Sequence, residues 1–409
     1  MFIWIVWGVI AVSVFMSLFW LNILQKEEVD VRSYPDPDEF PSISVLIPAY
    51  NEERIIADAI DSVLEQDYPR QLLDIIVVND GSTDGTQEIV EEYEERGDVT
   101  LINQENQGKG GALNTGLEHA TGDLISVQDA DSVIEPDAFR KMVGHFQKSD
   151  VGGVIAGIKP LETDTVWKKL QRVEYLLGIL YRRLMSAINT LYITPGALSL
   201  YRRDLVKEFG GFDEDNLTED LEIALRLKKH GYNIEMTAPA ITRTEFPQSF
   251  RDLMRQRVRW YRGLINNTLR YREMIFNREY GLFGTFQMPL HLVFPFVSMI
   301  GAFMVVYGIG ETVFNSLLWL SSAGFTLYNP FAGYTPYRFL LAFNVKVYFP
   351  LIIGAILVGA LIYLSHRYTD EKLKHPLSIG AFFIIYYTIL GIFWCMAVGQ
   401  EITRREKRW

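Results

Sequence analysis

The chain has 409 residues, more than one ordinary soluble core needs, so more than one structural unit is expected. Its net charge of −11 argues against a nucleic-acid-binding protein, which normally presents a basic surface. The single cysteine, Cys395, lies in an apolar run, which excludes a disulfide framework and a thiolate metal cluster and suits a reducing compartment. Apolar residues are concentrated in the first 24 residues and after about residue 283, whereas the region between them has the pattern of a soluble α/β protein.

The first apolar run, residues 2–24, contains no charged side chain and is long enough to cross the roughly 30 Å hydrocarbon layer of a bilayer as a helix. A cleaved signal peptide is the alternative, but it would begin with basic residues and have a shorter apolar core. We therefore expect a transmembrane helix over residues 1–25. A linker rich in proline and aspartate follows over residues 26–41.

Three segments near the other end are candidates for membrane helices: Gly284–Gly308, Val345–Ser365 and Pro376–Val398. The stretch Thr312–Leu327 is shorter and more polar, and is expected to be re-entrant, interfacial or a loop. We thus expect about three membrane helices over residues 284–400 and a basic tail over residues 401–409. With four spans in all, both chain ends lie on one side, and one of two basic clusters then violates the positive-inside rule.

The central region predicts alternating strands and helices. Its strand candidates are the β-rich apolar runs Ile43–Pro48, Asp74–Val78, Val99–Ile102 and Leu124–Val127. Helical stretches follow the first two, over Glu53–Leu64 and from Thr86. This alternation predicts a mostly parallel sheet covered on both faces, in which ligands bind at the carboxyl ends of the strands. The polar motifs of the chain fall at these ends.

Asp129 and Asp131 stand one residue apart, directly after the fourth predicted strand. Two such carboxylates can converge on a hard cation, and Mg²⁺ and Mn²⁺ prefer oxygen ligands. The cation would neutralise a diphosphate leaving group as its charge develops. A turn that caps the helix after Pro136 would explain the same residues, and an isolated Asp-x-Asp is more often a turn than a metal site. The pair therefore predicts a metal site only in company with other motifs.

Two glycine-containing turns lie nearby. In the first, over residues 79–86, Asp80 at the strand tip can accept hydrogen bonds from a ribose or a base edge. The second, over residues 106–114, contains Lys109 and opens a helix, an arrangement that suits a phosphate. Its spacing is not that of the Walker motif, which disfavours an ATPase. A plain strand–turn–helix connection and a flexible loop with a solvated lysine are the alternatives.

The motif Thr218-Glu219-Asp220 precedes a helix rich in leucine and isoleucine. Asp220 is a candidate general base that takes the proton of an attacking hydroxyl. Capping of the helix by Thr218, with acidic residues in the first turn, explains the same three residues without catalysis.

Gln256, Arg259 and Trp260 share one face if their segment is helical. An arginine suits a pyrophosphate, and an indole suits the apolar face of a sugar ring. Basic and apolar residues alternate around these three, which indicates amphipathic helices on the membrane surface over residues 249–283. The segment Val166–Ile188 has a similar interfacial character. A purely anchoring role for these helices is the alternative.

Together and in this order, the motifs resemble those of the family-2 inverting glycosyltransferases. The resemblance is to the membrane-bound processive branch that includes synthases of hyaluronan, chitin, cellulose and poly-N-acetylglucosamine. It covers residues 42 to about 271, and it rests on Pro48-Ala49-Tyr50-Asn51-Glu52, Asn79-Asp80-Gly81-Ser82, residues 106–114, Asp129-Ala130-Asp131, Thr218-Glu219-Asp220 and Gln256-x-x-Arg259-Trp260. It implies a GT-A fold, a Rossmann-like α/β domain over residues 42–248, beside α-helical membrane segments.

The resemblance also implies roles for individual residues. The implied nucleotide-binding set is Pro48, Tyr50, Glu52, Asp80, Lys109, Asp129 and Ala130. Asp129 and Asp131 would hold Mg²⁺ or Mn²⁺ with the diphosphate, and Asp220 would be the catalytic base. The implied acceptor and diphosphate set is Gly196, Glu219, Gln256, Arg259 and Trp260. Proline precedes Gly196 where many members have another residue, which leaves the identity of the acceptor open.

The implied function is inverting, metal-dependent transfer of a sugar, expected to come from a UDP-sugar, to a growing polysaccharide, processive and coupled to translocation. The expected partners are the nucleotide-sugar donor, a polysaccharide or lipid-linked acceptor and membrane lipids, with no nucleic acid. We expect an integral protein of the plasma membrane whose catalytic domain is cytoplasmic. One alternative is transfer of a single sugar to a lipid carrier such as a polyprenyl phosphate. Another is a nucleotide-sensing transporter or receptor, which the few charges inside the predicted spans disfavour.

Overall fold

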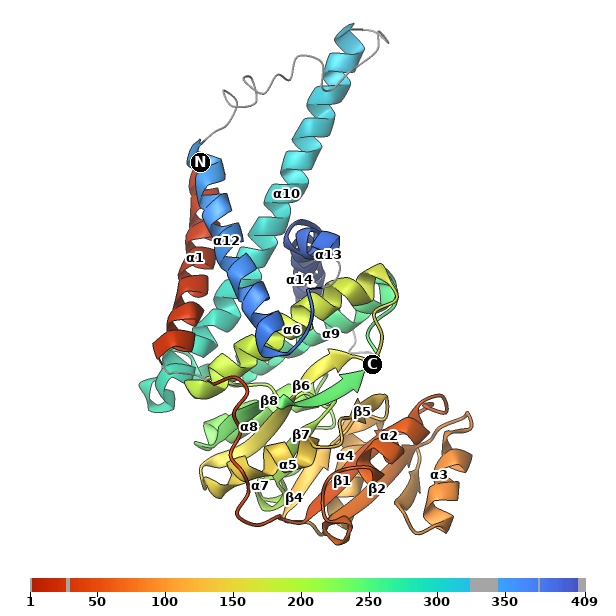
Figure 1. The fold of residues 1–409 in the computed structure, drawn as a ribbon. Helices are drawn as coiled ribbons and strands as arrows, with labels where there is room; N and C mark the ends of the chain where they lie inside the picture. The colour runs from red at the N-terminus through yellow and green to blue at the C-terminus, as the bar shows by residue number, and fades with distance from the viewer. Residues whose placement is uncertain (1, 27–29, 324–344, 374–375, 404–409) are drawn as a thin grey trace.

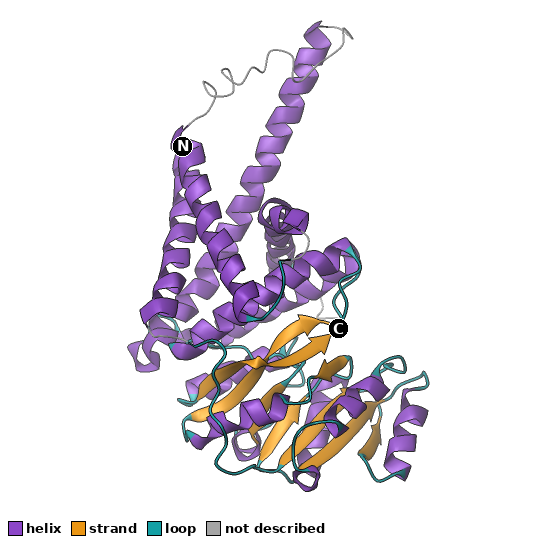
Figure 2. Ribbon diagram, viewed as in Figure 1, coloured by secondary structure: helices purple, strands orange, loops and turns teal. Residues whose placement is uncertain are grey.

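The computed structural model describes residues 2–26, 30–323, 345–373 and 376–403. Figure 1 shows two regions, a sheet packed with short helices and a group of long helices that stands on one side of it. In Figure 2 the strands lie in the first region, and the described elements of the second region are helices joined by loops.

The strands form one eight-stranded sheet in the order β3-β2-β1-β4-β7-β6-β8-β5. Their bounds are β1 Ile43–Ala49, β2 Leu73–Asp80, β3 Thr100–Gln104, β4 Leu124–Val127, β5 Ser132–Ile134, β6 Val151–Pro160, β7 Ser199–Arg202 and β8 Asn233–Thr244. Strands β1 to β4 are mutually parallel, and β6 pairs in parallel with β8. Only β7 and β5 run antiparallel to their neighbours. This mostly parallel sheet confirms the predicted fold class.

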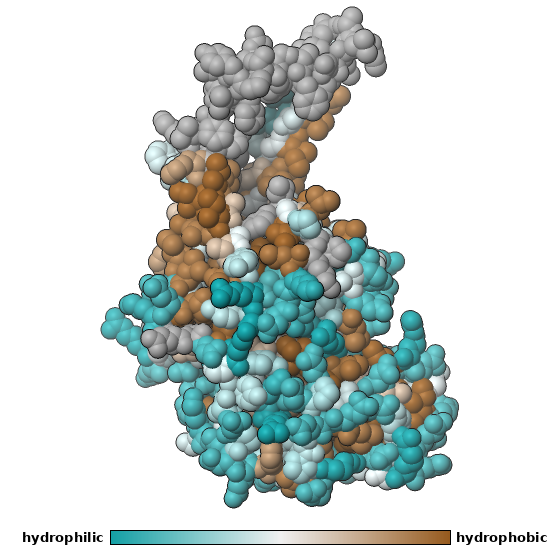
Figure 3. All heavy atoms as spheres, viewed as in Figure 1, coloured by the Kyte–Doolittle hydropathy of each residue, from teal (hydrophilic) through white to brown (hydrophobic). Residues whose placement is uncertain are grey.

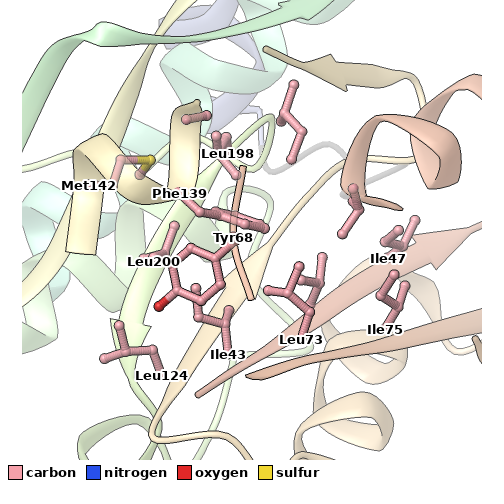
Figure 4. Close-up of a cluster of buried hydrophobic side chains, with 14 of the residues drawn as sticks. Ile43, Ile47, Tyr68, Leu73, Ile75, Leu124, Phe139, Met142, Leu198 and Leu200 are labelled. Carbon is pink, nitrogen blue, oxygen red and sulfur yellow. The ribbon is translucent and has the colours of Figure 1, made fainter. Parts of the chain in front are cut away.

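Short helices cover both faces of the sheet. They are α2 Ile56–Leu64, α3 Thr86–Glu95, α4 Gly108–His119, α5 Ala138–Val143, α7 Arg203–Glu208 and α8 Glu219–Lys229. Side chains alternate across a strand, so Val45 and Ile47 enter one apolar cluster while Leu46 enters the cluster on the other face. Figure 4 shows the first cluster, where Tyr68 and Phe139 pack beside the side chains of β1 and β2. Burial on both faces explains why the predicted strands are continuous apolar runs.

Two long helices, α6 (Val166–Ala187) and α9 (Phe250–Arg270), lie between the sheet and the group of long helices (Figure 1). Each begins at a capping side chain, Thr165 for α6 and Ser249 for α9. Several charged side chains of α6 are buried among protein groups, among them Lys168 and Arg172. The expectation that this segment lies on the membrane surface stays a prediction, and Val166 and the stretch Tyr181–Arg183 keep part of their surface accessible.

Three helices of the described residues are long and apolar enough to cross a membrane, over Trp7–Lys26, Phe283–Leu318 and Phe349–Tyr368. They belong to α1 (Phe2–Lys26), to α10 (Met288–Ala323) with the π-helical turn η5 before it (Phe283–Gln287), and to α12 (Val345–Tyr368). Apolar side chains cover the visible sides of these helices in Figure 3. The chain is therefore a membrane protein.

Helix α10 continues without a break past Gly308 to Ala323. The expectation of a separate re-entrant, interfacial or loop segment from Thr312 is wrong as far as Ala323, and residues 324–327 lie outside the described residues. The hydroxyl groups of Thr312 and Ser316 donate to carbonyl oxygens four residues earlier, at 2.8 Å in each case. Polar residues that bond to their own helix in this way do not interrupt it.

The last expected span, Pro376–Val398, falls on three consecutive helical elements, and its crossing of the membrane stays a prediction. It forms α13 (Pro376–Ala381), the π-helical turn η6 (Phe382–Tyr386) and α14 (Tyr387–Ile402), and α14 is shorter than the three spanning helices. Figure 1 shows α14 running across the direction of α1 and α12, close to α6 and α9. Its two ends are held to α9, where Arg257 lies 3.5 Å from Tyr386 and Arg262 pairs with Glu401 at 2.5 Å.

The loop after α12 is fixed to the sheet region by ion pairs. Glu371 pairs with Lys159 of β6 at 3.0 Å and with Arg172 of α6 at 2.8 Å. Beside it, Asp370 pairs with Arg32 of the segment that follows α1, at 2.5 Å. The ends of α12 and α1 that meet here therefore lie on the catalytic side of the membrane region.

Candidate active site

The candidate site begins where β4 ends. Asp129 follows this strand, and its backbone N–H donates to the carbonyl of Gly196 at 2.9 Å. A Cβ on Gly196 would lie 2.8 Å from Asp129 Oδ1 and closer still to Lys109 Nζ. A side chain at position 196 would therefore displace the lysine and the aspartate, which pack directly against the backbone of Gly196.

Lys109 joins the two halves of the site. Its ammonium lies 2.5 Å from Asp129 Oδ1 and 3.3 Å from Glu219 Oε1. Burial disfavours the charged lysine, but the carboxylates of Asp129, Glu219 and Asp220 outweigh it and raise the pKa of Lys109. The structure thus brings the predicted metal pair and the predicted base into one cluster, with Lys109 beside Asp129 rather than near the nucleoside alone.

The far side of the cluster carries an excess of negative charge. Burial and the neighbouring Asp129 raise the pKa of Asp131, although Thr244 and Ser132 each donate a hydrogen bond to its Oδ1 at 3.1 Å. Burial, followed by the charges of Asp131 and Asp129, raises the pKa of Glu52 to about 7. Carboxylates that repel one another in this way are stabilised by a bound cation.

These residues fit Mg²⁺ or Mn²⁺. Among the described residues, no three His, Cys, Asp or Glu side chains form a ready-made metal cage. Mg²⁺ does not require one, because it is usually held by one or two carboxylates, by water and by phosphate oxygens of the substrate. Asp129 and Asp131 supply the two carboxylates.

The candidate base stands at the start of α8. Burial and the adjacent Glu219 raise the pKa of Asp220 to about 6, while Lys109 and Arg259 act in the opposite direction. The hydroxyl of Thr194 donates to the backbone carbonyl of Asp220 at 2.6 Å. A carboxyl that titrates near neutral pH suits a general base.

The capping interpretation of Thr218 is wrong in its main point. Thr218 occupies the cap position of α8, but its side chain makes no capping hydrogen bond. Its hydroxyl instead accepts from Asn267 of α9 at 3.1 Å and lies against Gly263. Thr218 therefore joins the helix of the candidate base to α9.

Four of the predicted nucleotide-binding residues lie at the carboxyl ends of β1 and β2: Pro48, Tyr50, Glu52 and Asp80. Both carboxylate oxygens of Asp80 accept backbone N–H groups at the start of α4, from Gln107 at 2.8 Å and from Gly108 at 2.9 Å. Pro48 is half-buried and Tyr50 is exposed, as a surface that receives a flat base requires. Ala130 is buried in the core, so its side chain faces away from solvent.

Helix α9 holds the third predicted motif. Trp260 packs against the apolar cluster that includes Tyr175, Ala197 and Phe246. Arg259 is half-buried and acts on the charge of Asp220, and the Oε1 atom of Gln256 is buried without a hydrogen-bond partner. The helix therefore presents Arg259 and Trp260 toward the loop of Gly196 and toward the base.

Sequence reasoning missed the arginine between these residues. Arg257 is buried, pairs with Glu174 of α6 at 2.7 Å and lies 4.3 Å from the ring centre of Trp260. The motif contains two arginines two residues apart, and only the packing of α9 against α6 shows which of them is enclosed. Thr194 was also missed, because nothing in the sequence indicates that its hydroxyl reaches position 220.

Residues 41–263 match the model of the family described as "Glycosyltransferase like family 2". The chain belongs to this family. It is therefore a glycosyltransferase with a GT-A fold, as the motif resemblance implied, and the interpretation as a transporter or receptor is set aside.

Similar proteins include two named as poly-beta-1,6-N-acetyl-D-glucosamine synthases. The one from Staphylococcus aureus (strain COL) is 29% identical over 313 residues, 73% of each chain. The one from Staphylococcus epidermidis is 32% identical over 264 residues, 61% of this chain and 63% of the relative. A solved mannosyltransferase from Pyrobaculum calidifontis, in complex with GDP-Man and Mn2+, has a TM-score of 0.62 at 22% identity and covers 98% of this chain, with 96% of its own chain matched. This last likeness concerns the fold.

Proposed function

We propose that the enzyme transfers a sugar, with inversion, from a nucleotide-sugar to the terminal hydroxyl of a growing polysaccharide. The observation that carries the proposal is the shared lysine. Lys109 contacts both Asp129, on the diphosphate side, and Glu219, next to the candidate base. The diphosphate and the base would thereby lie close enough for one sugar ring to contact both.

A divalent cation held by Asp129 and Asp131 would neutralise the diphosphate of the donor. Asp220 takes the proton of the acceptor hydroxyl as its oxygen attacks the anomeric carbon from the side opposite the nucleotide. Arg259 and Lys109 place positive charge beside the departing diphosphate. Trp260 offers an apolar ring face on which the acceptor sugar packs.

A polymeric product is supported by the names of the similar Staphylococcus proteins. A UDP-sugar is the donor we propose, with processive addition and passage of the product across the membrane. Helices α6 and α9 lie between the sheet and the spanning helices, so the site is next to the membrane region that such a product would have to cross (Figure 1). Transfer of a single sugar to a lipid carrier is the competing mode.

We also propose that the catalytic domain lies in the cytoplasm, with the protein in the plasma membrane. If α13 and α14 do not cross, three spans remain, and the conflict with the positive-inside rule disappears. Lys26, Arg32, Arg367 and Lys372 all then lie on the catalytic side, with Glu401 at the end of α14.

The test replaces Asp220 with Asn and supplies labelled donor with Mg²⁺ or Mn²⁺. We expect sugar transfer to fall by at least about a thousandfold while the nucleotide still binds, since a missing base affects the transition state and not the ground state. Turnover retained in this variant would remove Asp220 from the mechanism. In the unmodified enzyme a ladder of products indicates processive addition, and a single species indicates transfer to a lipid carrier.

A further inference from the structure

Arg182 of α6, in the layer between the sheet and the spanning helices, forms no ion pair with another residue in the described part of the chain. Its Nη1 atom is buried and has no hydrogen-bond partner. Its guanidinium group folds back along α6, with Cζ and Nη2 each 3.9 Å from the place where a Cβ on Gly178 would stand. The side chain as a whole is only half-buried, so part of it remains accessible.

The charged groups that face Arg182 do not balance. They are Glu174 of α6 and Arg257 of α9, accompanied by Tyr175 and Tyr192. Glu174 is already engaged, because it accepts from Arg257 at 2.7 Å and from the hydroxyl of Tyr386 at 2.6 Å. Two guanidinium groups thus share one carboxylate, which leaves one positive charge over.

Such a charge is expensive to keep. Burial lowers the pKa of Arg182, which shows that its surroundings oppose the charged form, yet an arginine stays protonated. A buried charge whose partner is removed destabilises the protein, and an arginine without a partner is in the corresponding position. A ligand that brings a negative charge would remove this cost.

The position is next to the acceptor side of the active site. Tyr192, which faces Arg182, lies two residues before Thr194 and four before Gly196, and these two contact Asp220 and Asp129. On the other side, Arg257 stacks on Trp260 at 4.3 Å. Arg182 is therefore behind the residues that receive the acceptor, on the side away from the nucleotide.

The position is also at the level of the bilayer surface. Tyr181, the residue before Arg182, has its ring 5.8 Å from that of Trp20, at the catalytic end of α1. Tryptophan and tyrosine side chains favour this boundary between lipid and water. Further along α6, Leu184 belongs to the same apolar cluster as Leu361 of α12. A lipid phosphate near this end of α1 would therefore lie close to Arg182.

We propose that Arg182 binds the phosphate group of a lipid-linked acceptor and so holds its first sugar in front of Asp220. The proposal rests on the proposed transfer function and adds the chemical class of the acceptor that begins the chain. Arginine binds phosphate through two parallel N–H···O bonds, and a wholly neutral glycan would leave its charge unpaired. The chemistry at the sugar is unchanged. The acceptor oxygen forms the bond to the anomeric carbon, the bond to the diphosphate breaks with its electron pair, and the proton goes to Asp220.

The experiment measures binding and not only turnover. The full chain in detergent is titrated with farnesyl phosphate, with farnesol and with inorganic phosphate, each followed by the shift in melting temperature. We expect farnesyl phosphate to bind, and to bind about ten- to a hundredfold more weakly to Arg182→Gln. The matched control is Arg183→Gln, because Arg183 is the next residue of α6 and faces Glu235 and Asp30 instead. This control should bind farnesyl phosphate as the unmodified chain does.

Equal binding of farnesyl phosphate to the unmodified chain and to Arg182→Gln would overturn the proposal. Equal binding of farnesol would also overturn it, because the hydrocarbon alone would then be recognised. So would displacement of farnesyl phosphate by low concentrations of inorganic phosphate or of the donor nucleotide, because the phosphate would then occupy the donor side of the site. The two proposals fail separately. If the enzyme hydrolyses the donor but binds no lipid through its phosphate, only this inference is refuted. If it transfers sugar with no donor and no acceptor, the proposed function is refuted, and the binding result alone decides the role of Arg182.

Discussion

Replacement of Lys109 by methionine should shift the pH dependence of catalysis. Lys109 is one of two cations that lower the pKa of Asp220, which burial and Glu219 raise to about 6. It lies 3.3 Å from Glu219, so the whole acidic group loses a close counter-charge when the ammonium is removed. At an effective dielectric constant of about 20, two charges 4 Å apart interact by about 4 kcal/mol.

The magnitude follows from that figure. One pKa unit corresponds to about 1.4 kcal/mol, and part of the Coulomb energy is lost to solvent, so we expect the pKa of Asp220 to rise by about one to two units. A base with a pKa of about 6 is about nine-tenths ionised at pH 7. After the rise it would be about one-half to one-tenth ionised. The pH-dependent part of the loss in turnover should therefore be about two- to tenfold at pH 7 and disappear above about pH 9, on top of a pH-independent loss of the charge that Lys109 places beside the departing diphosphate.

The assay is kcat against pH with saturating donor and metal, so that weaker binding does not enter. Lys109→Arg should keep the midpoint of the acidic limb near its original value, because it retains the charge. Lys148→Met is the control for general loss of a lysine, since Lys148 is exposed and its ion pair is with Glu235, which is not part of the site. If Lys109→Met lowers kcat equally at all pH values, the argument that this lysine controls the ionisation of the base is refuted.

Three further predictions concern the metal site and the fold. Gly196→Ala should lower kcat/KM about ten- to a hundredfold with little loss of stability, since the added Cβ would lie 2.8 Å from Asp129 Oδ1; normal activity would show that the loop yields easily. Activity titrated with Mn²⁺ should require more metal as the pH falls below about 7. The reason is that Glu52, with a pKa of about 7, and Asp131 take up protons that compete with the cation. This pH dependence should flatten in Glu52→Gln, whereas Asp131→Asn should bind the metal weakly at all pH values. Glu371→Gln should destabilise the protein by about 2–4 kcal/mol in thermal unfolding, because the nearly buried Lys159 and Arg172 lose the carboxylate that they share. An unchanged melting temperature would mean that solvent takes the place of this carboxylate.

The first half of the sheet was predictable because its strands are buried on both faces. Ile43–Ala49 and Leu73–Asp80 carry long apolar runs that end in polar motifs, and the structure confirms both. The later strands were not singled out. Ser199–Arg202 has four residues and Ser132–Ile134 has three, too short for a periodicity. Their place in the sheet is determined by pairing with distant strands, which local sequence does not encode.

For the site, sequence order placed the motifs at one edge of the sheet but did not give the contacts between them. Nothing local indicates that Lys109 reaches both Asp129 and Glu219, since the three residues are separated by long stretches of chain. The roles assigned to individual residues stay predictions. The number of spans also stays a prediction, because α14 is as apolar as a spanning helix and is held to α9 by the pair of Arg262 with Glu401.

An odd number of crossings would have a practical consequence for the two termini. If α1, α10 and α12 are the spans, the start of α1 at Phe2 and the end of α14 at Ile402 open into different compartments. A fluorescent or affinity tag placed before Phe2 would then be translocated with its residues, whereas one placed after Ile402 would remain beside the nucleotide-sugar pool. The choice of tag position would thus decide whether insertion is disturbed. A membrane-impermeant thiol reagent would distinguish the two ends in variants with one cysteine added at either end, because the single cysteine of the chain, Cys395, lies within α14.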